Sequence, residues 1–197
     1  MTSIRFQFSP SKLVQAIAYF AWQKVPKLDK LKTVKLLYFA DKHHLLKHGR
    51  PILGDIYFCM PHGPVPSFSK NVIDDALDDD NDTEKSLLTY VAVDKSAKHA
   101  RFISKAKPNL GELSASEIEA LDATISKYGQ VDPWPLRELS HKEPCWLISH
   151  GNKPDGVESV EMPYELFFEG QPDDVRAILE LVRAEQEERD FASDLAR

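Results

Sequence analysis

The cysteine and histidine side chains are the first candidates for chemistry, because thiolates and imidazoles bind zinc and act as nucleophiles or bases. His141, Cys145 and His150 are spaced four and five residues apart, and Cys59 and His62 form a C-x2-H pair. Neither group has the C-x2-C spacing typical of zinc sites, and no sequence typical of an oxyanion hole accompanies either cysteine. We therefore expect no metal, no cofactor and no catalytic residue, and hence a protein that is not an enzyme.

An acidic run over residues 74–84 is the second candidate. Its alternating aspartates match the first ligand positions of a calcium-binding loop, but the positions that need glycine and glutamate are both threonine. We interpret the run as a solvated loop that presents an acidic face to a basic partner. This face is formed by Asp78, Asp79, Asp80 and Asp82.

Asp41 is the third candidate, because it is an acid on a helix that is otherwise apolar on nearly every side. That helix, predicted for residues 30–47, should be buried at the centre of the fold. A desolvated carboxylate must accept hydrogen bonds or become protonated. Asp41 is therefore either a binding or catalytic acid, or a structural acid that accepts hydrogen bonds from loop amides or from Arg50. We favour the structural interpretation.

Helical periodicity, capping residues and prolines define the elements that must position these side chains. Ser114 and Glu117 form a predicted capping box, Ser67 is a predicted cap, and Gly49 should end the central helix. The expected helices cover residues 11–25, 30–47, 68–77, 114–129 and 134–140 and begin again at residue 172, and residues 183–197 are expected to form a mobile tail.

The predicted β structure is small. Residues 52–60 are expected to be extended, and residues 87–93 and 100–104 should form a hairpin around the turn 94–99. Three prolines and a glycine within residues 61–66 predict a rigid loop without regular structure. The fold class is therefore mainly α with a small β element (α+β): a compact helical domain around a buried central helix, with a short hairpin.

Charge is divided unevenly along the 197 residues. Residues 1–70 carry eleven Lys or Arg against three acids, and residues 71–197 carry fourteen against twenty-eight. Such a division predicts two faces of opposite sign and a charged macromolecular partner. The lysines of residues 24–35 could bind phosphates, but lysine reads base edges poorly, so direct nucleic-acid binding is not favoured.

The remaining composition is that of an ordinary globular protein, with 42% hydrophobic and 28% charged residues. The sequence has two cysteines, no signal peptide and no apolar stretch long enough to span a membrane. We expect a cytoplasmic protein with reduced thiols and no contact with a membrane.

Two groups of residues resemble the motifs of the Panacea domain, the SocA-like antitoxin family that also includes phage-associated GepA-like proteins. The first is Lys35-Leu-Leu-Tyr-Phe-Ala-Asp41, followed by His48-Gly-Arg-Pro-Ile-Leu-Gly-Asp55, Tyr57 and His62-Gly-Pro-Val-Pro66. The second is Ser140-His-Lys-Glu-Pro144 followed by Trp146, where Cys145 separates a proline and a tryptophan that are adjacent in the family's motif. Residues 30–70 and 138–147 carry the resemblance, and residues 1–197 are expected to be a single domain of this family.

The resemblance implies an antitoxin of a bacterial or phage-borne toxin–antitoxin system, active in phage defence, that neutralises a cognate toxin from an adjacent gene by direct protein–protein binding. An alternative is an adaptor that delivers the toxin to a ClpXP-type protease. A further alternative is a phage-associated nucleic-acid-binding or metal-dependent protein, and homo-oligomerisation stays open. The residues expected to bind the toxin or organise the domain are Tyr38, Asp41, Tyr57, His62, Gly63, Pro64, Val65, Pro66, His141 and Trp146.

Overall fold

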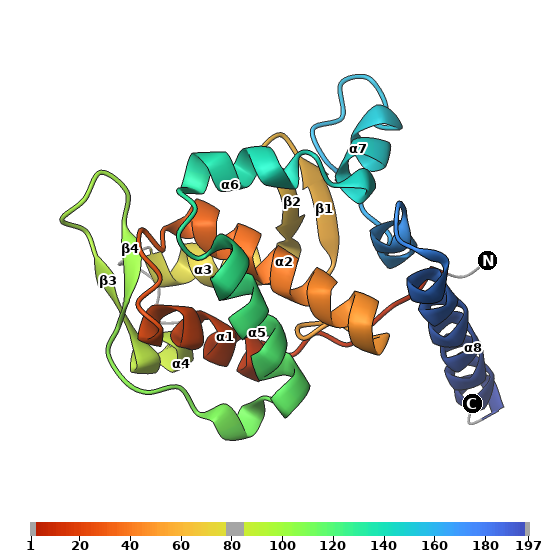
Figure 1. Cartoon of the computed structure of the whole chain (residues 1–197), viewed down its shortest axis with the longest axis horizontal. Coiled ribbons are helices and arrows are strands. Elements are labelled where there is room, and N and C mark those ends of the chain that lie inside the picture. The colour runs from red at the N-terminus through yellow and green to blue at the C-terminus, as the bar shows by residue number, and fades with distance from the viewer. Residues whose placement is uncertain (1–2, 78–84, 196–197) are drawn as a thin grey trace.

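Helix α2 (Lys30–His48) runs through the middle of the protein, and other elements pack around it (Figure 1). The computed structural model describes residues 3–77 and 85–195. Buried side chains, among them Leu36 and Tyr38, occur on all sides of α2, because its apolar residues leave no continuous polar face. The helix ends at Gly49, whose φ of 71° lies in the left-handed region that favours glycine. The predicted fold class and the buried central helix are both confirmed.

The other elements cover α2 from several directions, with α5 and α6 lying along it. The capping box of Ser114 and Glu117 precedes α5, as predicted. In chain order, the other elements are α1 (Pro10–Trp22), β1 (Tyr57–Met60), β2 (Gly63–Pro66), α3 (Ser67–Leu77), α4 (Lys85–Tyr90), β3 (Val91–Asp94), β4 (Arg101–Ser104), the 3-10 helix η2 (Leu110–Glu112), α5 (Ala115–Tyr128), α6 (Pro133–Ser140), α7 (Pro144–Gly151), β5 (Val160–Glu161), the 3-10 helix η3 (Tyr164–Phe168) and α8 (Asp173–Leu195).

The prolines of residues 61–66 do not prevent regular structure, contrary to the prediction. Gly63–Pro66 forms β2, an edge strand of a three-stranded antiparallel sheet in the order β2-β1-β5. An edge strand pairs on one side only, so Pro64 and Pro66, which lack an N–H group, are tolerated there. The sheet holds this segment against α2.

The predicted hairpin is present but shorter than expected, because part of its first strand is helical. Strands β3 and β4 pair along Val91–Asp94, whereas residues 85–90 form α4 and pack on α1. Leu87 in α4 and Val91, the first residue of β3, are both buried. A short apolar run carries too little periodicity to distinguish a strand from a helix.

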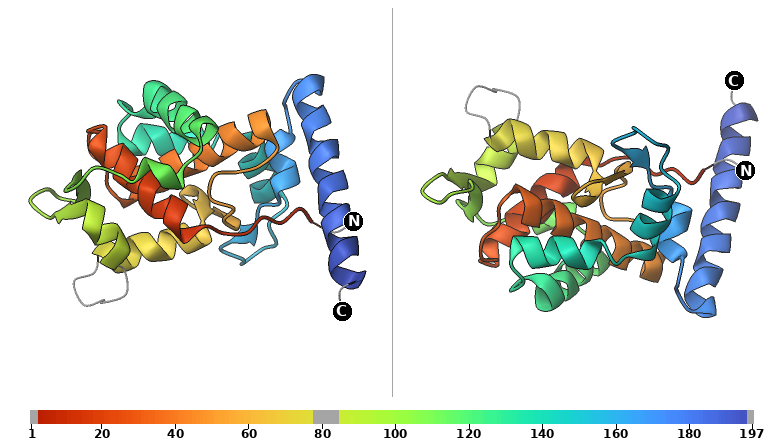
Figure 2. Two further views of the ribbon diagram at one scale, coloured as in Figure 1. Left: turned by 90° about the horizontal axis from the view of Figure 1, so that it is seen from below. Right: turned by 90° about the horizontal axis from the view of Figure 1, so that it is seen from above.

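Helix α8 and the β3–β4 hairpin lie at opposite ends of the molecule (Figure 2). Ile178 and Val182 of α8 lie against Gly49, where α2 ends. Residues 183–195, most of the expected tail, continue α8. Within residues 3–77 and 85–195, no helix is both long and apolar enough to cross a membrane.

The uneven division of charge serves contacts inside the molecule. In the described part of the chain, eight ion pairs join a basic residue up to position 70 to an acid beyond it. Glu117 pairs with Lys12 and Arg50, and Asp74 pairs with Lys30 and Lys70. These pairs use six of the twenty-eight acids beyond position 70, and residues 78–84 lie outside the described residues, so the two opposed faces stay a prediction.

Candidate binding groove

Asp41 is buried and joins α2 to the segment that leads into the sheet. Its Oδ1 accepts hydrogen bonds from the backbone N–H groups of Ile52 (3.0 Å) and Leu53 (2.9 Å), and its Oδ2 accepts one from the Tyr57 hydroxyl (2.9 Å). Burial raises the pKa of Asp41 to about 7, although these donors oppose the rise. The loop amides required by the structural interpretation are present, whereas Arg50 pairs elsewhere.

Asp55, which the sequence analysis does not single out, caps α3. Its Oδ1 accepts a hydrogen bond from the N–H of Phe68 (2.9 Å), and its Oδ2 accepts from the N–H (2.7 Å) and the hydroxyl (2.6 Å) of Ser69. These N–H groups belong to the first turn of the helix and have no partner within it. The predicted cap, Ser67, is instead the first residue of the helix.

Tyr38 joins α2 to α7 in the core. Its hydroxyl lies 3.0 Å from Cys145 Sγ and donates to Glu143 Oε2 (3.2 Å), which also pairs with Lys42. Burial raises the pKa of the Cys145 thiol, and the residue that interrupts the second motif is thus a packing cysteine. Tyr38, Asp41 and Tyr57 all organise the interior.

The two sequence motifs meet at Gly63, at the start of β2. Its φ is 93°, and a Cβ on this residue would lie 2.5 Å from Ser140 Oγ, 2.9 Å from Lys35 Nζ and 3.1 Å from the His141 ring. Only glycine fits this position without displacing its neighbours. Trp146 stacks on His141 with ring centroids 4.2 Å apart, and its Nε1 donates to a β1 carbonyl (3.2 Å). The motifs thus form one junction from α2, β2, α6 and α7.

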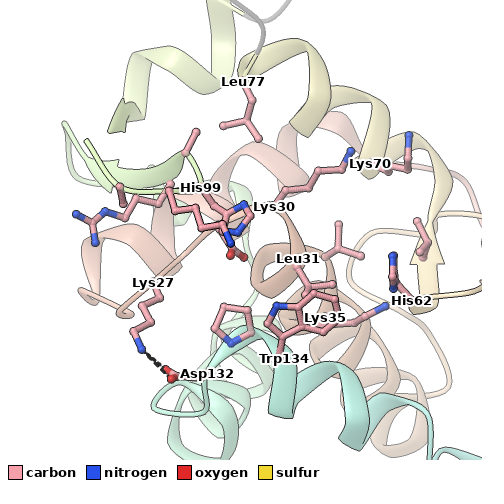
Figure 3. A pocket seen from close by; sticks show the side chains of 18 of the residues that line it. Lys27, Lys30, Leu31, Lys35, His62, Lys70, Leu77, His99, Asp132 and Trp134 are labelled. Carbon is pink, nitrogen blue, oxygen red and sulfur yellow. Dashed lines mark hydrogen bonds and ion pairs between the residues drawn. The ribbon is translucent and has the colours of Figure 1, made fainter. Parts of the chain in front are cut away.

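A groove of about 1050 Å³ opens beside this junction, between α2, α3, α6 and the β3–β4 hairpin (Figure 3). Leu31 and Val65 contribute to its apolar surface. Trp134 of α6 forms one wall and is 57% exposed. The His62 ring meets the indole edge-on at 5.8 Å, and the Arg137 guanidinium lies 5.4 Å from the indole centroid. Of the ten predicted site residues, His62 and Val65 line the groove.

Lys35 lines the groove from α2 although its side chain is 0% exposed. Its Nζ donates to the carbonyl oxygen of Pro64 (2.8 Å), and its side chain points toward His62 (Figure 3). The ammonium thus satisfies an acceptor of the edge strand β2. Burial lowers the pKa of Lys35 to about 7, and the nearby positive charge of Arg137 contributes to the lowering.

Lys35 is predicted only as one of the lysines of residues 24–35 that could bind phosphates, and Trp134 is not predicted as a site residue. The argument that selects Asp41, a charged residue on a helix without a polar face, applies equally to Lys35, whereas no pattern in the sequence marks Trp134. Among the described residues, no three His, Cys, Asp or Glu side chains are grouped as a metal ion would require. The predicted acidic face lies outside the described residues: Asp78, Asp79, Asp80 and Asp82.

These features define a small helical domain in which two distant sequence motifs fold into one junction beside a cation-lined groove. The family model described as antitoxin SocA-like, Panacea domain, matches residues 34–147, which is more than half of the chain. The protein therefore belongs to the SocA-like antitoxin, Panacea domain family, as its motifs predict. No curated protein and no solved structure gives a significant match.

Proposed function

We propose that this protein is a cytoplasmic antitoxin that neutralises a protein toxin by binding it directly in the groove. The family is one of antitoxins, and the matched residues 34–147 include both the junction at Gly63 and the α6 wall. The observation that carries the proposal is the convergence of the two motifs beside the groove. A tryptophan at the edge of a partly apolar groove is also the type of residue that dominates binding energy at protein interfaces.

The test is coexpression with the product of the neighbouring reading frame in a bacterial host. We expect that product to stop growth, this protein to restore growth, and the two chains to elute together on size exclusion. Trp134→Ala should weaken restoration, whereas Trp22→Ala, which changes a 38% exposed tryptophan outside the groove, should not. Restoration without a complex, or equal effects of the two variants, would contradict neutralisation through the groove.

The alternative, delivery of the toxin to a ClpXP-type protease, differs in its effect on toxin lifetime. Direct neutralisation predicts that the toxin persists in the complex whether or not the protease is present. A toxin half-life that falls only when this protein and the protease are both present would identify an adaptor. The same assay tests the acidic run by reversing the charges of Asp78, Asp79, Asp80 and Asp82. If this variant neutralises the toxin as well as the wild type does, the acidic run does not contact the toxin.

A further inference from the structure

The ammonium of Lys35 has unused hydrogen-bonding capacity at the groove. An ammonium carries three N–H donors. Among the described residues, Lys35 Nζ has one hydrogen-bond partner, the Pro64 carbonyl oxygen. A buried charge is stable only when it is paired or well hydrogen-bonded. The position therefore calls for an additional acceptor. Lys35 lines the groove but is 0% exposed, so an acceptor in the groove reaches its ammonium only when a covering side chain moves aside.

Lys32, one turn earlier on α2, shows how the same fold satisfies a buried lysine. It is also 0% exposed, but its Nζ donates to two carbonyl oxygens, those of Pro26 and Gly129, both at 2.7 Å. Burial lowers the pKa of Lys32 as well, but two nearby carboxylates, Asp132 and Asp29, oppose that lowering. Lys32 does not line the groove. An arrangement with two carbonyl acceptors is thus available to a buried lysine on this helix, and Lys35 has only one such acceptor.

The groups that face Lys35 from neighbouring elements do not supply an anion. They are the Cys59 thiol on β1, His62 in the β1–β2 turn, Arg137 on α6 and His141 after α6. Arg137 donates to His62 Nδ1 (3.1 Å) and pairs with Glu138, an adjacent residue on the surface. The buried His141 Nε2 also has no hydrogen-bond partner in the described part of the chain. The junction is therefore a cluster of basic groups.

The rim of the groove favours a ligand with few charges over a polyanion. Four of its cations are already paired: Lys27 with Asp132, both Lys30 and Lys70 with Asp74, and Arg101 with Asp94. Among the described residues, Lys98 is the rim lysine without an ion pair. Nucleic acids bind through many unpaired cations that each contact a phosphate. A protein segment with one carboxylate at Lys35 and an apolar side chain against the apolar surface matches the groove better.

We propose that the groove binds an acidic segment of a partner protein, with one Asp or Glu carboxylate of that segment accepting hydrogen bonds from Lys35 and a neighbouring apolar side chain packing on Trp134. The proposal rests on the proposed function only in taking the partner to be the toxin. A carboxylate at Lys35 would favour the ammonium form, so binding should take up protons where free Lys35 is partly neutral, at and above about pH 7.

The probe is a random library of displayed peptides of about twelve residues, selected against the full-length protein. We expect an enriched sequence in which Asp or Glu adjoins an apolar residue. Fluorescence anisotropy with the synthetic peptide should then show a loss of about tenfold or more for Lys35→Met, as for one charge-assisted hydrogen bond. The matched control is Lys47→Met, which changes a lysine of the same helix that pairs with Glu119 outside the groove.

Three further measurements make the test specific. Replacing the acidic residue of the peptide by its amide should weaken binding to the wild type but not to Lys35→Met. Trp134→Ala, an exposed substitution that leaves the core intact, should weaken binding of every selected peptide. The affinity of the wild type, but not of Lys35→Met, should fall as pH rises from about 7 to 9, because binding that takes up a proton weakens as protons become scarcer.

The outcomes separate this inference from the proposed function. Selection without enrichment of acidic residues, equal affinity of the selected peptide for wild type and Lys35→Met, or displacement of the peptide by tighter-binding single-stranded DNA would each overturn the inference. Peptide binding that behaves as expected, together with failure to neutralise the neighbouring gene product, would support the inference and refute the antitoxin role. Neutralisation that Lys35→Met leaves intact would refute the inference alone.

Discussion

Replacing Lys35 by methionine is expected to make the protein more stable while it weakens peptide binding in the groove. Methionine keeps the length and volume of the side chain but carries no charge to desolvate. The pKa of Lys35 falls from 10.5 to about 7 because the side chain is buried. At about 1.4 kcal/mol per pKa unit, the buried charge destabilises the fold by roughly 4–5 kcal/mol near neutral pH.

The substitution also leaves the Pro64 carbonyl oxygen without its donor. An unsatisfied buried acceptor costs about 1–3 kcal/mol. The net expectation at pH 7 is therefore a gain of roughly 2 kcal/mol in the free energy of unfolding. Lys32→Met is the matched comparison and should be less favourable, because it leaves two carbonyl oxygens without their donor where Lys35→Met leaves one.

The pH dependence provides a second, independent expectation. The pKa of Lys35 is lower in the folded protein than in the unfolded chain, so the unfolded chain binds more protons between about pH 7 and pH 10.5. The stability of the wild type should therefore rise relative to Lys35→Met, by about 2 kcal/mol from pH 7 to pH 9. Urea unfolding followed by tryptophan fluorescence measures both quantities. Parallel pH profiles for the two proteins would refute the assignment of a buried, destabilised charge to Lys35.

Three further substitutions test the scaffold. Asp41→Ala should lower the free energy of unfolding by about 2–4 kcal/mol, because it removes the acceptor of two backbone N–H groups and a buried tyrosine hydroxyl; an unchanged thermal midpoint would assign Asp41 a contact role instead. Asp55→Ala should lower the free energy of unfolding by about 1–2 kcal/mol. It should also increase hydrogen exchange in the first turn of α3, and the rest of the protein serves as the internal reference. Gly63→Ala should destabilise by about 1–3 kcal/mol, because of its φ of 93° and the close Ser140 hydroxyl; full stability would show that the junction yields to a methyl group.

The sequence predicts best the features that depend on neighbouring residues. The central helix, its end at Gly49 and the capping box before α5 all follow from local patterns, and they hold in the structure. The hydrogen bonds of Asp41 also follow, because a buried carboxylate in an apolar helix has few ways to be satisfied. The apolar run at residues 87–93 shows the limit of this approach, since helix and strand patterns coincide over so short a length.

Features that join distant segments of the chain cannot be predicted from local sequence patterns. The groove takes its walls from α2, α3, α6 and a hairpin, and its tryptophan has no distinguishing neighbours in the sequence. The sequence shows the uneven division of charge but not the ion pairs that it forms, because pairing of Lys12 with Glu117 or Lys30 with Asp74 depends on the tertiary fold. Proline in β2 is tolerated only because that strand is at an edge, which the sequence does not reveal.

The outer side of β2 also restricts how any other chain can approach the sheet. Strand addition needs a row of free N–H and carbonyl groups on the exposed edge. Pro64 and Pro66 have no N–H to offer, and Lys35 already occupies the Pro64 carbonyl oxygen. Neither a toxin nor a second copy of the chain can extend the sheet along this strand. Recognition there has to proceed through side chains, and the same arrangement protects this edge against self-association into larger β aggregates.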